Sequence, residues 1–359
     1  MMNRKKIALL CAASLTLTSL AGCGSGSSGT SNSSNTTSVA AQETAAETGT
    51  PSADARVLKL STTKAAESYA YDMLLDFAAE VEELSGGTLV VEIYPASQLG
   101  GQSESVEGMG LGTIEMGYLA CGATESFYPA SGLMGTLFTA VNEDHAMAIW
   151  NSDIATEIME AQAQAINVRC LDYSIEGSRS IWSKTPVNSL SDLKGLKLRV
   201  PEVPIFMNVF EGLGTSPTPM ALSEVYTGIQ TGIVDGVKYD LTGVLDYSFD
   251  ELCKYCYETH HGVSIMAFMI AENLYQSLTD EQKNAIDTAS ADISAAINEQ
   301  YYVALEESRQ ELEAEGVVFT EVSEDDMNTI NEIVAPLMED YIKDYATIDD
   351  LNALKALAE

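Results

Sequence analysis

The order of the first predicted elements constrains the fold of this chain most. Short apolar-rich runs typical of β-strands occur at residues 57–61, 88–94 and 114–119. Apolar residues at helical spacing separate these runs, over residues 73–84 and 103–110. The β-α-β-α-β order predicts a parallel sheet with helices on both faces, and therefore an α/β fold class.

The middle of the chain continues this alternation. Strands are predicted near residues 168–173, 179–184, 196–200 and 233–239. Helices are predicted at about residues 204–213 and 222–231, and a mostly apolar extended run follows at residues 257–270.

A long helix is predicted after Thr279. Thr279 and Gln282 have the spacing of a capping box, and apolar residues then recur every three or four positions as far as Leu305. The pattern can continue to Glu313, before Gly316. About 35 residues at about 1.5 Å each span roughly 50 Å, which exceeds one lobe of a chain this size. We therefore expect one helix to cross two lobes. A strand over residues 317–322 and two closing helices complete the prediction.

The N-terminal residues resemble a lipoprotein signal. A cationic start precedes 14 mostly apolar residues (7–20), fewer than the roughly 20 that a membrane span needs. The run Leu20-Ala21-Gly22-Cys23 resembles a lipobox, so residues 1–22 are predicted to be a lipoprotein signal peptide. The alternative is an ordinary secretion signal with an incidental cysteine. Residues 23–54 are rich in Gly, Ser, Thr, Asn and Ala and are predicted to be a flexible linker, lipid-anchored at Cys23. The remainder is then extracytoplasmic.

The charge balance excludes some partners. The formal net charge is −35, and removal of residues 1–22 takes away three cations and no anions, which leaves −38. Such a chain does not favour nucleic acid or anionic lipid through its overall field. Its few arginines become informative, and those after the signal are Arg56, Arg169, Arg179, Arg199 and Arg309.

Four cysteines follow the lipobox: Cys121, Cys170, Cys253 and Cys256. Cys253 and Cys256 form a CxxC pair near His260 and His261. Free thiols, a disulfide and a metal site all remain open from the sequence. Adjacent histidines on an extended segment point to opposite faces, so a shared metal is disfavoured. No cofactor or metal is predicted.

Two arginines are candidate ligand contacts. Arg199 ends a predicted strand on which Leu198 and Val200 face a core, so Arg199 and Lys197 face the other way. An arginine at a strand end in an open α/β sheet lies near the crevice where such folds bind ligands, and its planar fork matches a carboxylate. Arg179, on the preceding strand, could assist. The alternatives are an ion pair with one of the chain's own acids for Arg199 and a surface position for Arg179.

Seven short motifs occur along the chain in a fixed order. They are SGG (85–87), QLGG (98–101), GTIEM (112–116), LKGLKLRVP (193–201), SPTPM (216–220), SEVYTGIQTG (223–232) and VDG (234–236). Through these motifs, of which LKGLKLRVP is the strongest, the chain resembles TRAP-type transporter substrate-binding proteins of the C4-dicarboxylate-binding (DctP-like) family. The likeness covers roughly residues 57–337.

The resemblance implies a two-lobed periplasmic-binding-protein-like (type II) fold with a long helix spanning both lobes. Lobe I is expected to comprise residues 55–176 plus 265–303, and lobe II residues 177–264 plus 304–359. The lobes would close over a small-molecule organic acid and deliver it to TRAP membrane permease subunits. The arginine of the family's R-V-P block holds the ligand carboxylate, which is Arg199 here, and Arg179 matches the arginine that often assists.

The chain departs from the family pattern after Asp235-Gly236. A tyrosine, Tyr239, stands where the family usually has a ligand-contacting asparagine, and Lys238 stands where glutamate is usual. Tyr239 could donate a hydrogen bond or stack on a ring, whereas we expect Lys238 to be solvated. Glu104 and Tyr71 are further candidate contacts. Dicarboxylates, sugar acids, 2-oxo acids, aromatic acids and acidic sugars remain possible ligands.

The sequence argues against two other functions. An extracytoplasmic hydrolase needs a nucleophile with a base, but the sequence has no Gly-x-Ser-x-Gly, no His-Glu-x-x-His and no phosphate-binding glycine loop. The chain is therefore not expected to be an enzyme. A solute-binding protein of an ABC importer or a sensor system is the alternative binding function, and the Arg-Val-Pro block argues against it.

Overall fold

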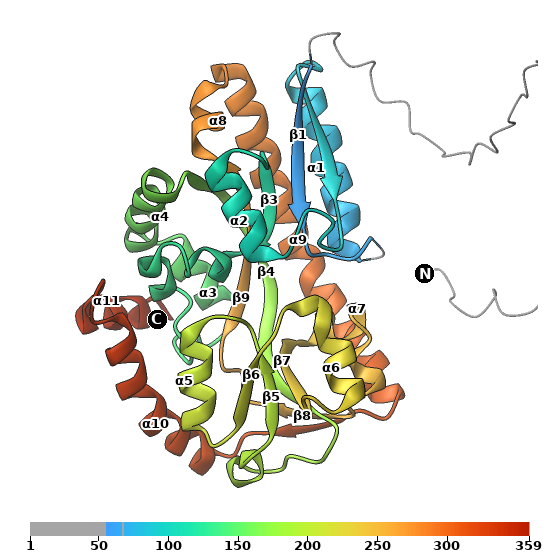
Figure 1. Ribbon diagram of the computed structural model, residues 1–359, viewed down its shortest axis with the longest axis vertical. Helices are drawn as coiled ribbons and strands as arrows, with labels where there is room; N and C mark the ends of the chain where they lie inside the picture. The colour runs from blue at the N-terminus through green and yellow to red at the C-terminus, as the bar shows by residue number, and fades with distance from the viewer. Residues whose placement is uncertain (1–54, 67, 359) are drawn as a thin grey trace, which may run out of the picture. The chain divides into compact units, whose positions relative to one another are not determined.

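The computed structural model describes residues 55–66 and 68–358 (Figure 1). The predicted signal peptide, the lipidation site Cys23 and nearly all of the linker lie outside the described residues. None of the helices within residues 55–66 and 68–358 is both long enough and apolar enough to cross a membrane.

The described residues form an α/β fold, as predicted. Its strands are β1 (Arg56–Thr62), β2 (Leu89–Tyr94), β3 (Met116–Ala120), β4 (Val168–Ser183), β5 (Lys197–Val200), β6 (Ser216–Pro219), β7 (Gly236–Asp240), β8 (Tyr255–Glu258), β9 (Val263–Ala271) and β10 (Val318–Glu321). The strand order β2-β1-β3-β9-β4-β7-β5-β6 forms the main path of one sheet, with β8 and β10 off it.

Helices cover this sheet. They are α1 (Tyr69–Leu84), α2 (Gln102–Leu111), α3 (Glu143–Trp150), α4 (Asp153–Ile166), α5 (Pro204–Gly212), α6 (Val225–Thr231), α7 (Leu241–Asp246), α8 (Glu272–Ser277), α9 (Asp280–Ala314), α10 (Glu324–Ile342) and α11 (Ile348–Lys355). Four of these helices, α3, α4, α7 and α8, were not predicted from the sequence.

The parallel β-α-β-α-β unit is confirmed at the start of the chain. β1 pairs in parallel with both β2 and β3, and β5 pairs in parallel with β6 and β7. β9 is antiparallel to both β3 and β4, so the sheet is mixed rather than wholly parallel.

One strand links the two groups of parallel strands. The sequence predicted two strands, near 168–173 and 179–184, but β4 is continuous. Its first part pairs with β9, and residues 179–183 pair with β7. Figure 1 shows β4 and β9 in the middle, with β1 and β3 above them and β5 to β8 below. The extended run predicted over residues 257–270 is divided into β8 and β9 by residues 259–262, where His260 has a positive φ of 42°.

A break in pairing marks the middle of β4. The register between β4 and β9 shifts between Ile175 and Gly177, and Gly177 has a φ of +146°. Glycine adopts this backbone conformation without the steric penalty that a Cβ brings. The shift lies at the lobe boundary predicted from the sequence, and the lobe limits themselves remain a prediction.

The long helix is confirmed. α9 has 35 residues, and its Thr279–Gln282 capping box has both reciprocal hydrogen bonds. At about 1.5 Å per residue it spans roughly 50 Å. It packs on α1, on β4 and on α7, and so contacts elements beside both groups of parallel strands. Near the C-terminus of the chain, the carbonyl of Leu354 on α11 lies 2.9 Å from Nε2 of His145 on α3.

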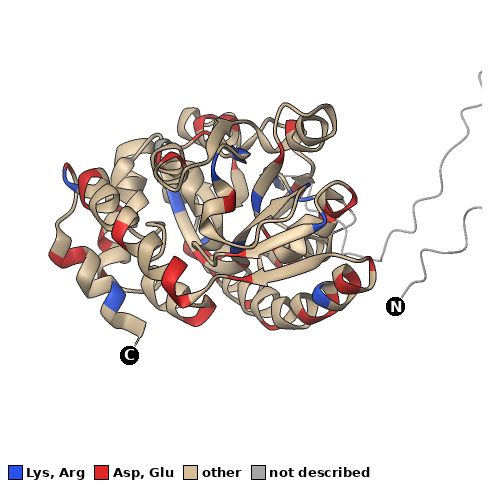
Figure 2. Cartoon of the chain, turned by 90° about the horizontal axis from the view of Figure 1, so that it is seen from below, with Lys and Arg blue, Asp and Glu red and all other residues tan. Residues whose placement is uncertain are grey.

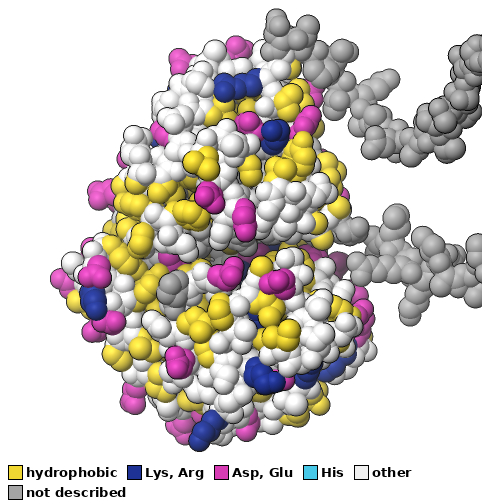
Figure 3. Space-filling model, viewed as in Figure 1, with side chains coloured by type: hydrophobic (Ala, Val, Ile, Leu, Met, Phe, Trp, Pro, Cys, Tyr) yellow, Lys and Arg dark blue, Asp and Glu magenta, His cyan; other side chains and the backbone are white. Residues whose placement is uncertain are grey.

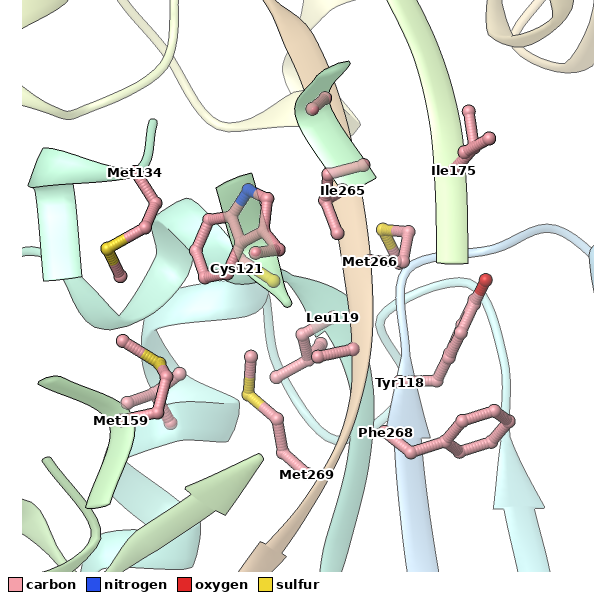
Figure 4. Packing of buried hydrophobic residues seen from close by; sticks show 14 of the residues in the cluster. Tyr118, Leu119, Cys121, Met134, Met159, Ile175, Ile265, Met266, Phe268 and Met269 are labelled. Atoms are coloured by element: carbon pink, nitrogen blue, oxygen red, sulfur yellow. The ribbon is translucent and has the colours of Figure 1, made fainter. Parts of the chain in front are cut away.

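The main hydrophobic core lies between the sheet and its helices. Figure 4 shows part of it, where methionines such as Met134, Met159 and Met269 fill space beside β3 and β9. The Phe268 ring lies 4.9 Å from Tyr118 and 4.5 Å from Phe77 between ring centroids. A second cluster around Trp182, Tyr239 and Phe249 includes buried residues of α6 and α7.

Charge is distributed unevenly. Acidic side chains are spread over the face in Figure 3, with Lys and Arg at isolated spots. Figure 2 shows several basic residues on strands in the middle of the folded unit, whereas acidic residues lie mostly on the surrounding helices. The four cysteines of the described chain are free thiols, and no group of three His, Cys, Asp or Glu residues there could hold a metal ion.

We predict that Gly177→Ala destabilises the protein more than Gly232→Ala. Both positions have a positive φ, but a Cβ at Gly177 would lie 3.0 Å from Cβ of Asp240 and 3.3 Å from the Tyr301 ring, whereas none lies within 4 Å at Gly232. The backbone term costs about 1–2 kcal/mol at either position, and crowding adds about 1–3 kcal/mol at Gly177. Urea denaturation followed by tryptophan fluorescence measures both. Equal losses in the two variants would contradict the account of the β4 break.

Candidate ligand-binding site

A cavity of about 210 Å³ lies at the carboxyl-terminal ends of β5 and β7. Its lining comes from residues that the sequence assigns to both lobes. Gln102 at the start of α2 and the turn at Cys121 come from the first, and Arg199 and Lys238 come from the second. Strand ends at the crevice of an open α/β sheet are the usual location of a ligand site.

Arg199 is buried in the cavity wall without a carboxylate partner. It is 4% exposed, and its Nε and Nη2 both donate to the Met220 carbonyl, at 2.9 and 2.7 Å. It forms no ion pair with any described residue, so the alternative of pairing with an acid of the chain is not what the structure shows. Burial, with the neighbouring Arg179 charge, lowers the pKa of Arg199 to about 10. The remaining N–H groups of the fork are free to meet an anion.

Arg179 lines the same cavity, but an internal acid balances its charge. Its Nη2 lies 2.5 Å from Oε2 of Glu176 and donates to the Ser264 hydroxyl at 2.7 Å. Glu176 also accepts from Nζ of Lys64 at 2.9 Å. Burial alone would raise the pKa of Glu176, but Lys64 and Arg179 outweigh it and lower that pKa. Arg179 is mostly buried, not the surface arginine that the alternative interpretation supposed.

Tyr239 is a buried wall residue beneath Arg179. Its ring centroid lies 5.1 Å from the Arg179 guanidinium carbon, which is a cation–π distance. Tyr247 and Phe249 pack edge-on against it, with ring centroids 5.6 and 5.7 Å away. Burial raises the pKa of Tyr239, so its hydroxyl keeps its proton.

Lys238 is not solvated as the sequence analysis expected. It is 1% exposed, lines the cavity, and its Nζ lies 3.6 Å from the centroid of the Phe206 ring on α5. Its ammonium has no hydrogen bond or ion pair to a described residue. Burial, together with the charges of Arg179 and Arg199, lowers its pKa well below the usual value. The expectation failed because β7 is a central strand covered on both faces, and all five of its residues are buried.

Glu125 and His261 also line the cavity, although neither was predicted from the sequence to be a site residue. Glu125 is 7% exposed and its Oε1 has no hydrogen-bond partner among the described residues; burial raises its pKa to about 8. His261 is fully buried, and its Nε2 likewise has no partner there. Burial and the charge of Lys238 lower the pKa of His261, so the ring is neutral. The sequence argument placed His260 and His261 on opposite faces of an extended segment, but both lie in the break between β8 and β9, where His260 is exposed and has a φ of 42°.

The remaining two predicted ligand contacts, Glu104 and Tyr71, differ in their position relative to the cavity. Glu104, in the first turn of α2, lines the cavity with an exposed side chain. Tyr71 is half-buried in the first turn of α1 and is not among the cavity-lining residues. The fold therefore brings Arg199, Arg179, Tyr239 and Glu104 to one cavity and leaves Tyr71 outside it.

The arrangement fits capture of an anion. Two buried basic groups, Arg199 and Lys238, face the cavity without an ion pair to a described residue, and Glu125 and His261 offer polar atoms that have no partner in the same part of the chain. Fixed cations in a water-poor cavity attract anions more strongly than solvated ones do.

Comparisons with known proteins agree on one family. Residues 60–344 match the family described as bacterial extracellular solute-binding protein, family 7 (DctP). A solute-binding protein of Roseobacter denitrificans is 32% identical over 68% of this chain and 75% of its own length. The sialic acid-binding periplasmic protein SiaP of Vibrio cholerae is 30% identical over 80% of this chain and 88% of its own.

Solved structures share the fold. A TRAP periplasmic solute-binding protein from Roseobacter denitrificans, with bound L-galactonate, has a TM-score of 0.75 at 28% identity and covers 84% of this chain and 98% of its own. One from Xanthobacter autotrophicus Py2, with bound β-D-galacturonate, has a TM-score of 0.78 at 23% identity over 83% of this chain and 99% of its own, and shows the fold alone. These matches confirm the predicted two-lobed fold and the resemblance to TRAP-type binding proteins. The chain belongs to family 7 of the bacterial extracellular solute-binding proteins.

Proposed function

We propose that this protein captures an organic acid in the cavity between its lobes and delivers it to a TRAP membrane permease. The observation that carries the proposal is Arg199, a buried guanidinium that faces the cavity and whose only hydrogen-bond acceptor within residues 55–66 and 68–358 is the Met220 carbonyl. A carboxylate can accept two parallel hydrogen bonds from such a fork and restore the interactions that burial removed.

The other cavity residues have supporting roles. Arg179, held by Glu176 and Ser264, is a rigid donor beside the ligand, and the Tyr239 ring forms a wall. Glu104 lies on the rim at the start of α2, where its carboxylate can accept a hydrogen bond from a ligand hydroxyl. Tyr71 can contribute only if closure of the lobes moves it toward the cavity. Residues 55–176 plus 265–303 and residues 177–264 plus 304–359 remain the proposed lobes.

The relatives support this ligand class. SiaP is named for binding sialic acid, and the solved relative at 28% identity holds L-galactonate. Both ligands carry a carboxylate, which is the group that Arg199 is placed to recognise. A ligand that binds the closed form better than the open form shifts the protein toward closure.

The protein acts by binding and release, without chemical change to the ligand. Family membership supports a TRAP permease, rather than an ABC importer or a sensor, as the partner. Incubation of the ligand with protein, followed by recovery of the unaltered ligand, is the expected result, and turnover would refute the binding function.

We also propose that the mature chain is tethered to the outer face of the cytoplasmic membrane, or in the periplasm, through lipid at Cys23. The support is the cationic start, the 14-residue apolar stretch and the Leu20-Ala21-Gly22-Cys23 sequence. Acyl chains attach a protein to a bilayer at about 0.8 kcal/mol per buried methylene, without a membrane-spanning helix.

Arg199→Ala should abolish the thermal stabilisation that organic acids give the wild-type protein. In a screen of carboxylic acids, a ligand at 100 times its dissociation constant adds about 2.7 kcal/mol of stability. Loss of one partner of a buried charged pair costs about 2–5 kcal/mol of binding. Arg199→Lys should weaken binding too, because an ammonium lacks the planar fork.

The control is Arg309→Lys, on α9, which pairs with Glu258 and Glu313 and does not line the cavity. It should leave the ligand-induced shift unchanged. An undiminished shift in Arg199→Ala would remove Arg199 from the site.

Cys23→Ala should release the protein from the membrane fraction and abolish incorporation of labelled fatty acid. Cys11→Ala is the matched control, because Cys11 lies within the apolar stretch of the signal and not in the lipobox. It should leave both readouts unchanged. Continued labelling of Cys23→Ala would contradict lipidation at this residue.

A further inference from the structure

Lys238 places an amine nitrogen in the cavity wall that no acceptor or acid of the described chain engages. Its side chain is 1% exposed, and both Lys238 and Phe206 line the cavity. Nζ lies 3.6 Å from the centroid of the Phe206 ring and has no hydrogen bond or ion pair to a described residue. The capture of a carboxylate by Arg199 makes no use of this nitrogen.

Four acidic side chains surround this part of the cavity, and none pairs with Lys238. Glu104 and Glu202 line the cavity with exposed side chains. Glu125 is buried there, and burial raises its pKa to about 8, so near neutral pH it is largely a neutral acid. Asp240 caps α7 through Oδ1, its Oδ2 has no partner among the described residues, and burial raises its pKa. No ion pair joins these four to Lys238, so none of their oxygens lies within 4.0 Å of Nζ.

The other neighbours favour the uncharged form of this amine. Burial, with the charges of Arg179 and Arg199, lowers the pKa of Lys238 well below its usual value. His261 lines the same cavity and is neutral, because burial lowers its pKa. Glu176 is already engaged in two ion pairs of its own. A lysine desolvated beside other cations is the usual setting of an amine nucleophile.

An uncharged amine reacts reversibly with a ketone or an aldehyde. The Nζ lone pair forms a bond to the carbonyl carbon, and the carbonyl oxygen takes up a proton. The C–O bond then breaks, water leaves with two hydrogens that come from the amine, and a C=N double bond remains. Glu125, whose Oε1 has no partner in the described chain, can give a proton to the departing hydroxyl and recover one from the nitrogen. Addition of water reverses each step, so no oxidant or other reactant is needed.

Lys238 and Arg199 reach the cavity from opposite faces of the sheet. Arg199 pairs in register with Val237 on the parallel neighbour β7, and side chains alternate along a strand, so Lys238 points away from the Arg199 side. Their contacts agree, because Lys238 lies over Phe206 of α5 whereas Arg199 binds the Met220 carbonyl. A ligand that reaches both groups therefore carries its carbonyl several bonds away from its carboxylate.

We propose that Lys238 binds the carbonyl group of an oxo acid reversibly, as an imine, while Arg199 holds the carboxylate of the same ligand. The ligand class is then carboxylic acids with a ketone or aldehyde several carbons from the carboxylate. The inference rests on the proposed function, in which Arg199 captures the carboxylate. Hydrolysis of the imine returns the ligand unaltered, as delivery to a permease requires. The glutamate that the resemblance led us to expect at this position could not form such a bond.

Imine trapping tests the inference on the wild-type protein. Cyanoborohydride reduces an imine to a stable secondary amine, so peptide mass spectrometry locates the bond as an added mass equal to the ligand less one oxygen atom. The panel pairs each oxo acid with the hydroxy acid of the same carbon chain. The pairs are 4-oxopentanoate with 4-hydroxypentanoate, 5-oxohexanoate with 5-hydroxyhexanoate, and galacturonate, an aldehyde in its open form, with galactonate.

At least one oxo acid should label Lys238 about tenfold faster, or more, than it labels Lys197, an exposed lysine of β5 outside the cavity. Only the free amine reacts, and its fraction rises about tenfold for each unit by which a lysine pKa falls. In protein unfolded with urea, the two lysines should label at similar rates. If every oxo acid of the panel labels native Lys238 no faster than Lys197, the inference is overturned, whether or not those acids bind.

Two variants assign the parts of the ligand. In calorimetry, wild type should bind the labelling oxo acid more tightly than its hydroxy partner, and Lys238→Met, which keeps an unbranched stem against Phe206, should bind both alike. Lys197→Met is the matched control and should keep the wild-type preference. Arg199→Ala should slow the labelling of Lys238, because the carboxylate loses its anchor. A preference for the oxo acid that survives in Lys238→Met would contradict the imine.

These outcomes separate the inference from the function on which it rests. If organic acids bind wild type and fail to bind Arg199→Ala, but none labels Lys238, organic-acid capture stands and the covalent role of Lys238 falls. If no organic acid binds wild type, or Arg199→Ala binds as wild type does, capture through Arg199 falls as well.

Discussion

Basic side chains buried in the wall of the cavity are the constraint around which this site is built. A buried cation needs a counterion or several acceptors, and breaking a buried pair leaves a large penalty. Among the described residues, the Arg199 guanidinium donates hydrogen bonds to one backbone carbonyl, and Nζ of Lys238 contacts the face of one aromatic ring. The surrounding surface is strongly acidic, with a net charge of −35 over the chain, so these interior basic groups stand out from the rest of the molecule. In the proposed function, an anion that enters the cavity is the counterion for these groups.

The fold supplies the position of this charge. Parallel pairing of β5 with β7 brings their carboxyl ends to one edge, and β4 carries Arg179 and Glu176 to the same place. β4 and β9 continue from one group of strands into the other, with the register shift at Gly177 beside the Glu176 ion pairs. The Lys64–Glu176–Arg179 contacts therefore tie β1's end to the middle of β4, where the predicted lobes meet.

Periodicity predicted most of the fold, because alternation and helical spacing depend on neighbours in sequence. The capping box at Thr279 and the strand carrying Arg199 are examples. Continuity of β4 was missed, because residues 174–178 lack clear alternation and Gly177 reads as a break. At the site, Arg199 and Arg179 were predicted to be near the cavity, and they lie in its wall. The Glu176 partnership, the burial of Lys238 and the participation of Glu125 and His261 depend on long-range packing that no local pattern encodes. The one signal available was for the burial of Lys238, which lies on a strand that has a neighbouring strand on each side.

A crystal structure of the protein with a bound organic acid tests the central claim most directly. The account predicts a ligand carboxylate paired with the Arg199 guanidinium, in a cavity walled by Tyr239 and Arg179. A complex in which the Arg199 fork turns away from the ligand, or pairs with an acid of the chain while the ligand carboxylate lies elsewhere, would contradict it.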